Sequence, residues 1–164
     1  MDKLVADLIA LLRDMLQSQQ RLLQIALIRQ DAMRSFDIEK LNTLHEQERM
    51  ETQNAESFES RRKTIIQQFR PILGNGVEPS VSEIARRCKD PAKTQLLALA
   101  GQLKTIVEQL ARHTRINAGI SDTVVKGLAK VLKVMTGLAQ HAGLYMRNGR
   151  KAALKGIHLL EVTG

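Results

Sequence analysis

The first seventy residues of this chain contain neither glycine nor proline. All ten glycines and all three prolines of the 164-residue sequence lie after Arg70. Because these two residues are the strongest helix breakers, their absence allows unusually long helices. We therefore expect an all-α fold in which residues 1–70 form an elongated antiparallel hairpin of two long helices. Long helices of this kind leave little room for a pocket, which favours a protein that presents surfaces to partners.

The first helix is expected over residues 2–34, because two apolar stripes run along this segment at helical spacing. The first stripe has the 4-3 spacing of a coiled-coil seam, and the second lies one residue further on. The stripes are Leu4, Leu8, Leu11, Met15, Leu22 and Ile25, and then Val5, Ile9, Leu12, Leu16, Leu23 and Ala26. Together they make a face too broad for one neighbour, which favours a bundle over a two-stranded coil.

The second helix is expected over residues 37–70. Asp37 supplies a side-chain acceptor suited to cap its start, and Pro71 ends it. Residues 45–54 contain a single apolar side chain, so we expect this stretch to face water on most sides. Ion pairs four residues apart, such as Glu59 with Lys63, suit such a solvated stretch.

Glycine and proline signals divide the rest of the chain. Residues 73–79 read as a loop, Ser80 with Glu83 forms a capping box, and Asp90-Pro91 marks another helix start. We expect one helical domain, 1–164, with the hairpin at 1–70, a loop and short helix at 71–91, a long helix at 92–138 and a basic, flexible tail at 139–164. Three glycines should weaken the long helix by about 1 kcal/mol each: Gly101, Gly119 and Gly127.

The positive charge is confined to the second half of the chain. Residues 1–70 carry 11 basic and 11 acidic side chains, whereas residues 71–164 carry 14 and 6. This asymmetry is compatible with a solvated basic face, an anionic membrane, nucleic acid or an acidic protein. The four aromatic residues are too few for a base-stacking platform, so nucleic acid is disfavoured. No apolar run or leader pattern indicates membrane insertion, and we expect a cytoplasmic protein.

No pattern in the sequence indicates catalysis, a cofactor, a metal site or a small-molecule substrate. Residues 45–49 begin like a zinc-protease helix, but Arg49 occupies the position of the second histidine ligand. Cys88 has no second cysteine to pair with, although Arg86-Arg87 beside it could lower its pKa. The glycines are too dispersed for a phosphate loop. We therefore expect a protein that is not an enzyme.

The segment 124–155 is the clearest candidate for a functional surface, because it pairs an apolar helix face with a lysine-rich one. The alternative is that residues 124–138 complete the bundle by packing on the first two helices. The apolar positions of the candidate surface are Val124, Leu128, Val131, Leu132, Met135 and Leu138.

The order of these features resembles the FlgN family of flagellar type III export chaperones. The resemblance rests on a short capped helix, a leucine-rich long helix with an asparagine, an aliphatic run ending in a glycine turn, and a tyrosine–glycine tail. These are Ser80–Ala85, Leu96-Leu97, Leu103, Asn117, Leu132–Gly137, and Tyr145 with Gly149. The chain departs from the family pattern by having Met135-Thr136-Gly137 in place of a leucine pair, and by its basic tail.

The resemblance implies a chaperone that binds hook–filament junction subunits in the cytoplasm, prevents their premature assembly and delivers them to the membrane protein of the export gate. It also implies that the apolar positions between Val124 and Leu138 bind the client, and that Tyr145 docks at the export gate. Two other functions remain open from the residues alone. One is a structural coiled-coil adaptor that oligomerises through residues 1–70, and the other is a basic peripheral membrane or nucleic-acid binder.

Overall fold

The computed structural model describes residues 1–74 and 79–142, and the side chains of these residues up to position 136. Every regular element in this part of the chain is helical, which confirms the all-α expectation. The flexible tail was expected over residues 139–164, but the long helix continues to Ala142, four residues beyond its expected end. The rest of the expected tail and the centre of the loop at 75–78 lie outside the described residues. The helices are α1 (Asp2–Arg34), α2 (Ile38–Gln68), α3 (Arg70–Leu73), α4 (Val81–Arg87) and α5 (Ala92–Ala142).

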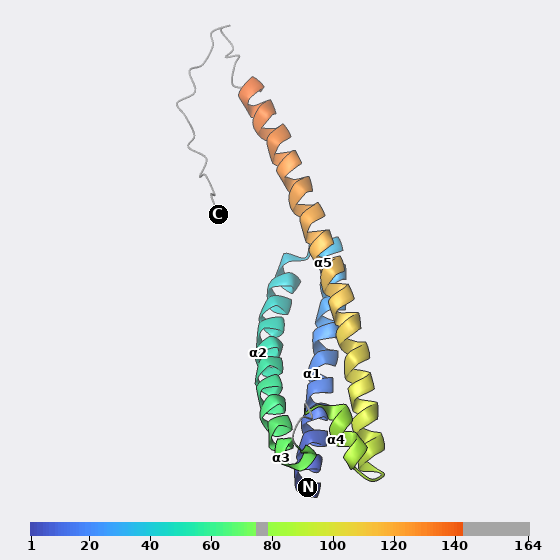
Figure 1. Cartoon of the computed structure of the whole chain (residues 1–164). Coiled ribbons are helices and arrows are strands. Elements are labelled where there is room, and N and C mark those ends of the chain that lie inside the picture. Colours follow the sequence, from blue (N-terminus) through green and yellow to red (C-terminus); the bar gives the residue numbers. More distant parts are fainter. Residues whose placement is uncertain (75–78, 143–164) are drawn as a thin grey trace, which may run out of the picture. The chain divides into compact units, whose positions relative to one another are not determined.

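The chain separates into two units, Met1–Ser121 and Asp122–Gly164, with the boundary inside α5. In the first unit, α1 lies between α2 and the first part of α5, and α3 and α4 lie near the N-terminus of α1 (Figure 1). The expected antiparallel hairpin of α1 and α2 is present. The central place of α1 explains its two apolar stripes, because each stripe has its own neighbouring helix to pack against.

All five helices contribute to the main hydrophobic core, which lies near the N-terminus of α1. The side chains of Leu8, Phe69, Ile84 and Leu96 are fully buried there, although they come from α1, the junction of α2 with α3, α4 and α5. A smaller cluster lies near the turn between α1 and α2. The main core contains Val5, Leu8, Ile9, Leu12, Ile66, Phe69, Leu73, Ile84, Ala85, Leu96 and Leu99, and the smaller cluster contains Ile25, Ala32 and Leu44.

The turn between α1 and α2 is a Schellman motif. The Asp37 amide donates to the Ala32 carbonyl at 3.0 Å, and the Phe36 amide donates to the Met33 carbonyl at 3.4 Å. Ser35 is the C-cap of α1, so Phe36 occupies the next position, and its φ of 54° lies in the left-handed region. The two long helices are therefore joined by only three residues.

Two of the expected helix caps form in the structure. The Asp37 carboxylate accepts from the Lys40 amide at 3.0 Å at the start of α2, and the Ser80 hydroxyl accepts from the Glu83 amide at 3.2 Å at the start of α4. The Glu83 carboxylate pairs with Arg86, one turn further along α4. In a complete capping box, the Glu83 carboxylate would also accept a hydrogen bond from the Ser80 amide. That bond is not among those that Glu83 makes here.

The expected boundaries around the two proline signals hold to within two residues. α2 ends at Gln68, and Pro71 lies in the first turn of the short helix α3, where a missing N–H costs nothing. α5 begins at Ala92, immediately after Asp90-Pro91. The Asp90 carboxylate accepts from the Thr94 hydroxyl at 2.6 Å, which ties the first turn of α5 to the residue that precedes it.

Residues 45–54 of α2 are mostly exposed, as their polar composition predicted. Glu51 links this stretch to α1, because its carboxylate accepts from the Ser18 hydroxyl at 3.1 Å and from Arg21 Nε at 2.8 Å. Further along α2, the expected pair of Glu59 with Lys63 is present at 3.9 Å. Arg62 binds the same carboxylate more closely, and its hydrogen bond is the main reason that the pKa of Glu59 is lowered.

We expect Phe69→Ala to lower the free energy of unfolding by about 3–5 kcal/mol, because the fully buried ring would leave a cavity between helices. Met50→Ala in α2, the helix that Phe69 follows, is the control. Its side chain is largely exposed, so the change should stay within about 0.5 kcal/mol. Chemical denaturation followed by circular dichroism measures both. Equal effects of the two substitutions would contradict this account of the core.

Candidate partner-binding surface

The first turns of α5 are held to the rest of the first unit by apolar burial. Leu96 and Leu99 are buried in the main core, and Leu103 packs against it. Burial of aliphatic side chains of this size contributes about 1.5–3 kcal/mol each. This part of α5 is therefore firmly attached to α1 and α4.

Further along α5, polar contacts join apolar side chains that are only half-buried. The Asn117 amide nitrogen donates to the Ala26 carbonyl of α1 at 2.8 Å, and the Ser121 hydroxyl lies 3.3 Å from Met33 Sδ. Gln30 Nε2 lies 2.9 Å from His113 Nδ1, as in a hydrogen bond. The buried Asn117 Oδ1 has no hydrogen-bond partner, which costs about 1–3 kcal/mol. The attachment of α5 to α1 thus weakens towards Ser121.

After Ser121, none of the described side chains of α5 is buried. The large apolar side chains at positions 125, 128, 131, 132, 134 and 135 are between 54% and 64% exposed, and Val124 is half-buried. Leu128, Val131, Leu132 and Met135, which the sequence proposed as a client surface, are therefore open to solvent. The side chain of Leu138 and the whole of Tyr145 lie outside the described residues.

We call residues 122–136 the distal segment of α5. At 3.6 residues per turn, Val124, Leu128, Val131, Leu132 and Met135 fall within an arc of about 100° around the helix. The lysines of the distal segment fall within an arc of about 60° on the opposite side. They are Lys126, Lys130 and Lys133, of which Lys126 pairs with Asp122 at 2.7 Å. The distal segment is thus an amphipathic helix with a solvent-exposed apolar face.

Three glycines of α5 have free space where a side chain would begin. A Cβ added at Gly101, Gly119 or Gly127 would meet nothing within 4 Å outside the helix's own neighbouring backbone. Each glycine therefore retains its intrinsic cost within a helix, which is about 1 kcal/mol relative to alanine. Gly127 lies in the distal segment, where no burial compensates for that cost.

The titratable residues singled out in the sequence form no reactive centre. Burial, followed by the nearby Asp2 carboxylate, raises the pKa of the Cys88 thiol, and the neighbouring arginines do not lower it. His45 is exposed on α2, and His113 contacts Gln30. No group of three or more histidine, cysteine or acidic residues that could hold a metal occurs in the part of the chain that the structure describes.

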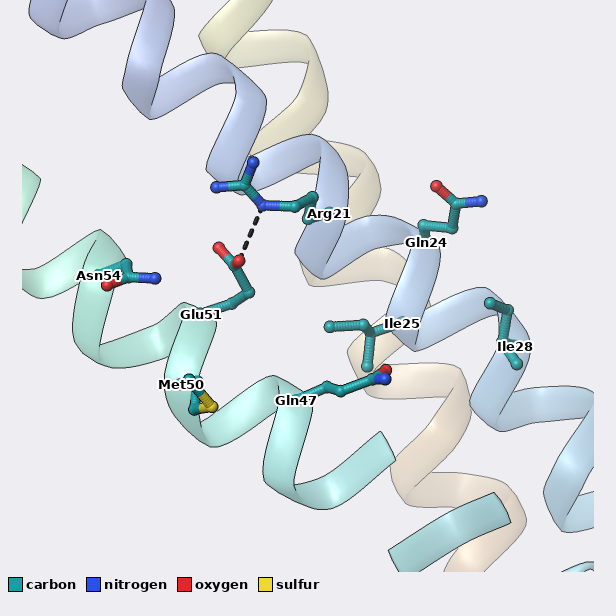
Figure 2. Close-up of a pocket in the computed structure, with 8 residues that line it drawn as sticks. All are labelled: Arg21, Gln24, Ile25, Ile28, Gln47, Met50, Glu51 and Asn54. Carbon is teal, nitrogen blue, oxygen red and sulfur yellow. Dashed lines mark hydrogen bonds and ion pairs between the residues drawn. The ribbon is translucent and has the colours of Figure 1, made fainter. Parts of the chain in front are cut away.

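A shallow groove of about 360 Å³ lies between α1 and α2 at the polar middle of the hairpin (Figure 2). Ile25 and Ile28 of α1 and Met50 of α2 provide its apolar lining, and the ion pair of Arg21 with Glu51 lies at one end. The groove contains no pair of groups arranged for catalysis. All of its lining residues lie on α1 and α2.

Comparison with known protein families gives one match, the FlgN protein family, over residues 1–153. The chain belongs to the FlgN family. No curated protein and no solved structure matches it.

The FlgN family consists of flagellar export chaperones, which agrees with the all-α bundle. The match includes the hairpin, the distal segment and Tyr145. None of the helices that the structure describes combines the length and hydropathy that a membrane crossing needs. A FlgN-family protein is therefore expected to act through its surfaces.

The sequence indicated the apolar face of this FlgN-family chain, Val125 included, but not the exposure of Val134. Together, Val125 and Val134 widen the apolar arc to about 180°. The polar contacts of Gln30 and Asn117 with their partner helices were not foreseen. Each of these polar residues lies within an apolar stripe, which is a signal in the sequence. The signal does not tell which residue each one contacts or where the packing between the helices ends.

We expect backbone amides in the distal segment to exchange hydrogen at least about 100-fold faster than those of residues 96–103, because no described side chain of the distal segment is buried. Hydrogen exchange measured by NMR or mass spectrometry checks this difference. Equal protection along α5 would show that the distal segment is packed as firmly as residues 96–103.

Proposed function

We propose that this protein is a cytoplasmic chaperone that binds hook–filament junction subunits, keeps them from assembling prematurely and delivers them to the flagellar export gate. Membership of the FlgN family supports the general role. The observation that carries the client site is the exposure of Leu128, Val131, Leu132 and Met135 on one face of the distal segment. A client helix with an apolar face of its own would cover these side chains.

The energetics suit reversible capture. Burying one exposed aliphatic side chain contributes about 1.5–3 kcal/mol, so four or five of them supply a substantial gross attraction. Part of that attraction offsets the entropy lost when the client and the distal segment become ordered. The glycine at position 127 raises this ordering cost, which keeps the complex dissociable when the client must be passed on.

Leu128→Asp combined with Leu132→Asp should abolish client capture, because two carboxylates would replace two apolar contacts. Binding of a purified junction subunit should weaken by tenfold or more, measured by isothermal titration calorimetry. The matched control is Ala129→Asp with Lys133→Gln. It changes the net charge by the same amount, but at positions outside the apolar arc. This variant should bind the client as the parent protein does. Circular dichroism should show that both variants keep the α1–α2 hairpin. Unchanged capture by the first variant, or its global unfolding, would refute this client site.

Salt dependence separates this function from the alternative of a basic nucleic-acid binder. Electrostatic binding weakens steeply between low and moderate salt, whereas burial of an apolar face does not. Client affinity should therefore change less than about threefold between 50 and 200 mM salt. An adaptor that oligomerises through residues 1–70 would instead keep its assembly state when the distal segment is altered.

Tyr145→Ala should spare client capture and impair delivery, because we assign Tyr145 to docking at the export gate. In cells that lack the native protein, the secreted amount of the junction subunit should fall while the purified variant binds the client normally. Tyr145→Phe keeps the ring and removes only the hydroxyl, so it shows which of these two groups the docking needs. Normal secretion with Tyr145→Ala would remove this residue from the delivery step.

A further inference from the structure

The turn between α1 and α2 holds an aromatic residue in an unfavourable place. Phe36 occupies the left-handed position of the Schellman motif, with φ of 54°, where glycine or asparagine is usual. A β-carbon in this conformation crowds the backbone, so phenylalanine is strained there. Strain of this kind persists where the surrounding structure or a function requires it.

Packing within the described protein does not compensate for this strain. The Phe36 side chain is 61% exposed, and Ile38, the first residue of α2, is 62% exposed. The other two phenylalanines are placed differently, because Phe58 is half-buried and Phe69 is fully buried. The turn thus presents an aromatic and an aliphatic side chain to solvent at the end of a rigid helical hairpin.

The charges around these two side chains have a small acidic excess. Asp37 and Glu39 alternate with Phe36 and Ile38 along the chain, and both are exposed, as is Lys40. Arg34, before the turn, pairs with Asp31 at 3.5 Å. The two carboxylates that alternate with the apolar side chains complement cationic groups on a protein partner. The distal segment has the opposite character, with lysines on its polar face. Two surfaces of opposite charge on one chain suit two different partners.

We propose that the turn is a docking point for a second protein, distinct from the client, that has an apolar pocket bordered by lysine or arginine. Phe36 fills the pocket, Ile38 packs at its edge, and Asp37 and Glu39 face the cationic border. Aromatic anchors in such pockets contribute much of the affinity of small interfaces. This inference rests on the proposed function, because it assigns the second partner to the step that follows client capture.

Phe36→Gly tests the proposal, since it relieves the strain and removes the anchor together. The melting temperature of the purified variant should equal or exceed that of the parent protein, by up to about 4 °C. Client affinity should be unchanged. The amount of junction subunit secreted by cells that carry only this variant should fall by about tenfold, as for loss of one aromatic anchor. Met50→Gln, which alters another exposed apolar side chain of the hairpin, is the matched control and should secrete normally.

Two further variants test the chemistry of the pocket. Phe36→Tyr keeps an aromatic ring and should retain most secretion, whereas Glu39→Lys should reduce secretion without weakening client capture. Normal secretion with Phe36→Gly, or improved secretion with Glu39→Lys, would overturn the proposal. Loss of client affinity in Phe36→Gly would also overturn it, because the turn would then contact the client itself. If the parent protein captures no junction subunit, the proposed function fails, and the assignment of this second partner fails with it.

Discussion

The packing of α1 against two neighbours is the constraint on which the first unit depends. Its two apolar stripes require a helix on each side, and α2 and the first part of α5 meet that requirement. α1 has 33 residues, whereas α5 has 51. A helix can be covered only as far as its neighbour extends. Within the first unit, the hydrogen bond of Ser121 with Met33 is the recorded contact furthest along both helices. The described side chains of α5 after Ser121 are not buried.

The change from apolar to polar contacts along α5 gives this surface a graded attachment. Leu96 and Leu99 anchor the base of α5, and the buried amide of Asn117 binds the Ala26 carbonyl near the end of the contact. A buried polar group with an unpaired oxygen contributes little stability, but it disfavours other registers of the two helices. The firm base and the exposed distal segment can therefore belong to one continuous helix.

Much of the fold followed from the sequence, because its signals are local. The breaker-free first half, the stripes of α1 and the caps at Asp37 and Ser80 each depend on residues only a few positions apart. The features that could not be predicted are contacts between distant segments. Examples are Gln30 with His113, and Ser18 with Glu51, because no spacing rule states which polar side chains meet across helices.

The candidate surface was predictable as a pattern but not as an exposed face. The same 4-3 spacing describes Leu96 and Leu99, which are buried, and Leu128 and Met135, which are exposed. Periodicity shows that a face is apolar, and only the length of the neighbouring helix decides whether it is covered. Cys88 shows a related limit, since the adjacent arginines suggested a lower thiol pKa, whereas burial, which sequence spacing does not reveal, raises it.

The three-residue connection between α1 and α2 leaves the hairpin no freedom in register. Asp37 closes the end of α1 through its backbone amide and caps the start of α2 through its side chain. This single residue therefore fixes the rotation of α2 about its axis relative to α1. One inserted or deleted residue would turn every side chain of α2 by about 100° relative to α1. Leu44 and Ile66 would then leave their buried positions together. In evolution, this turn can therefore exchange side chains but not change its length.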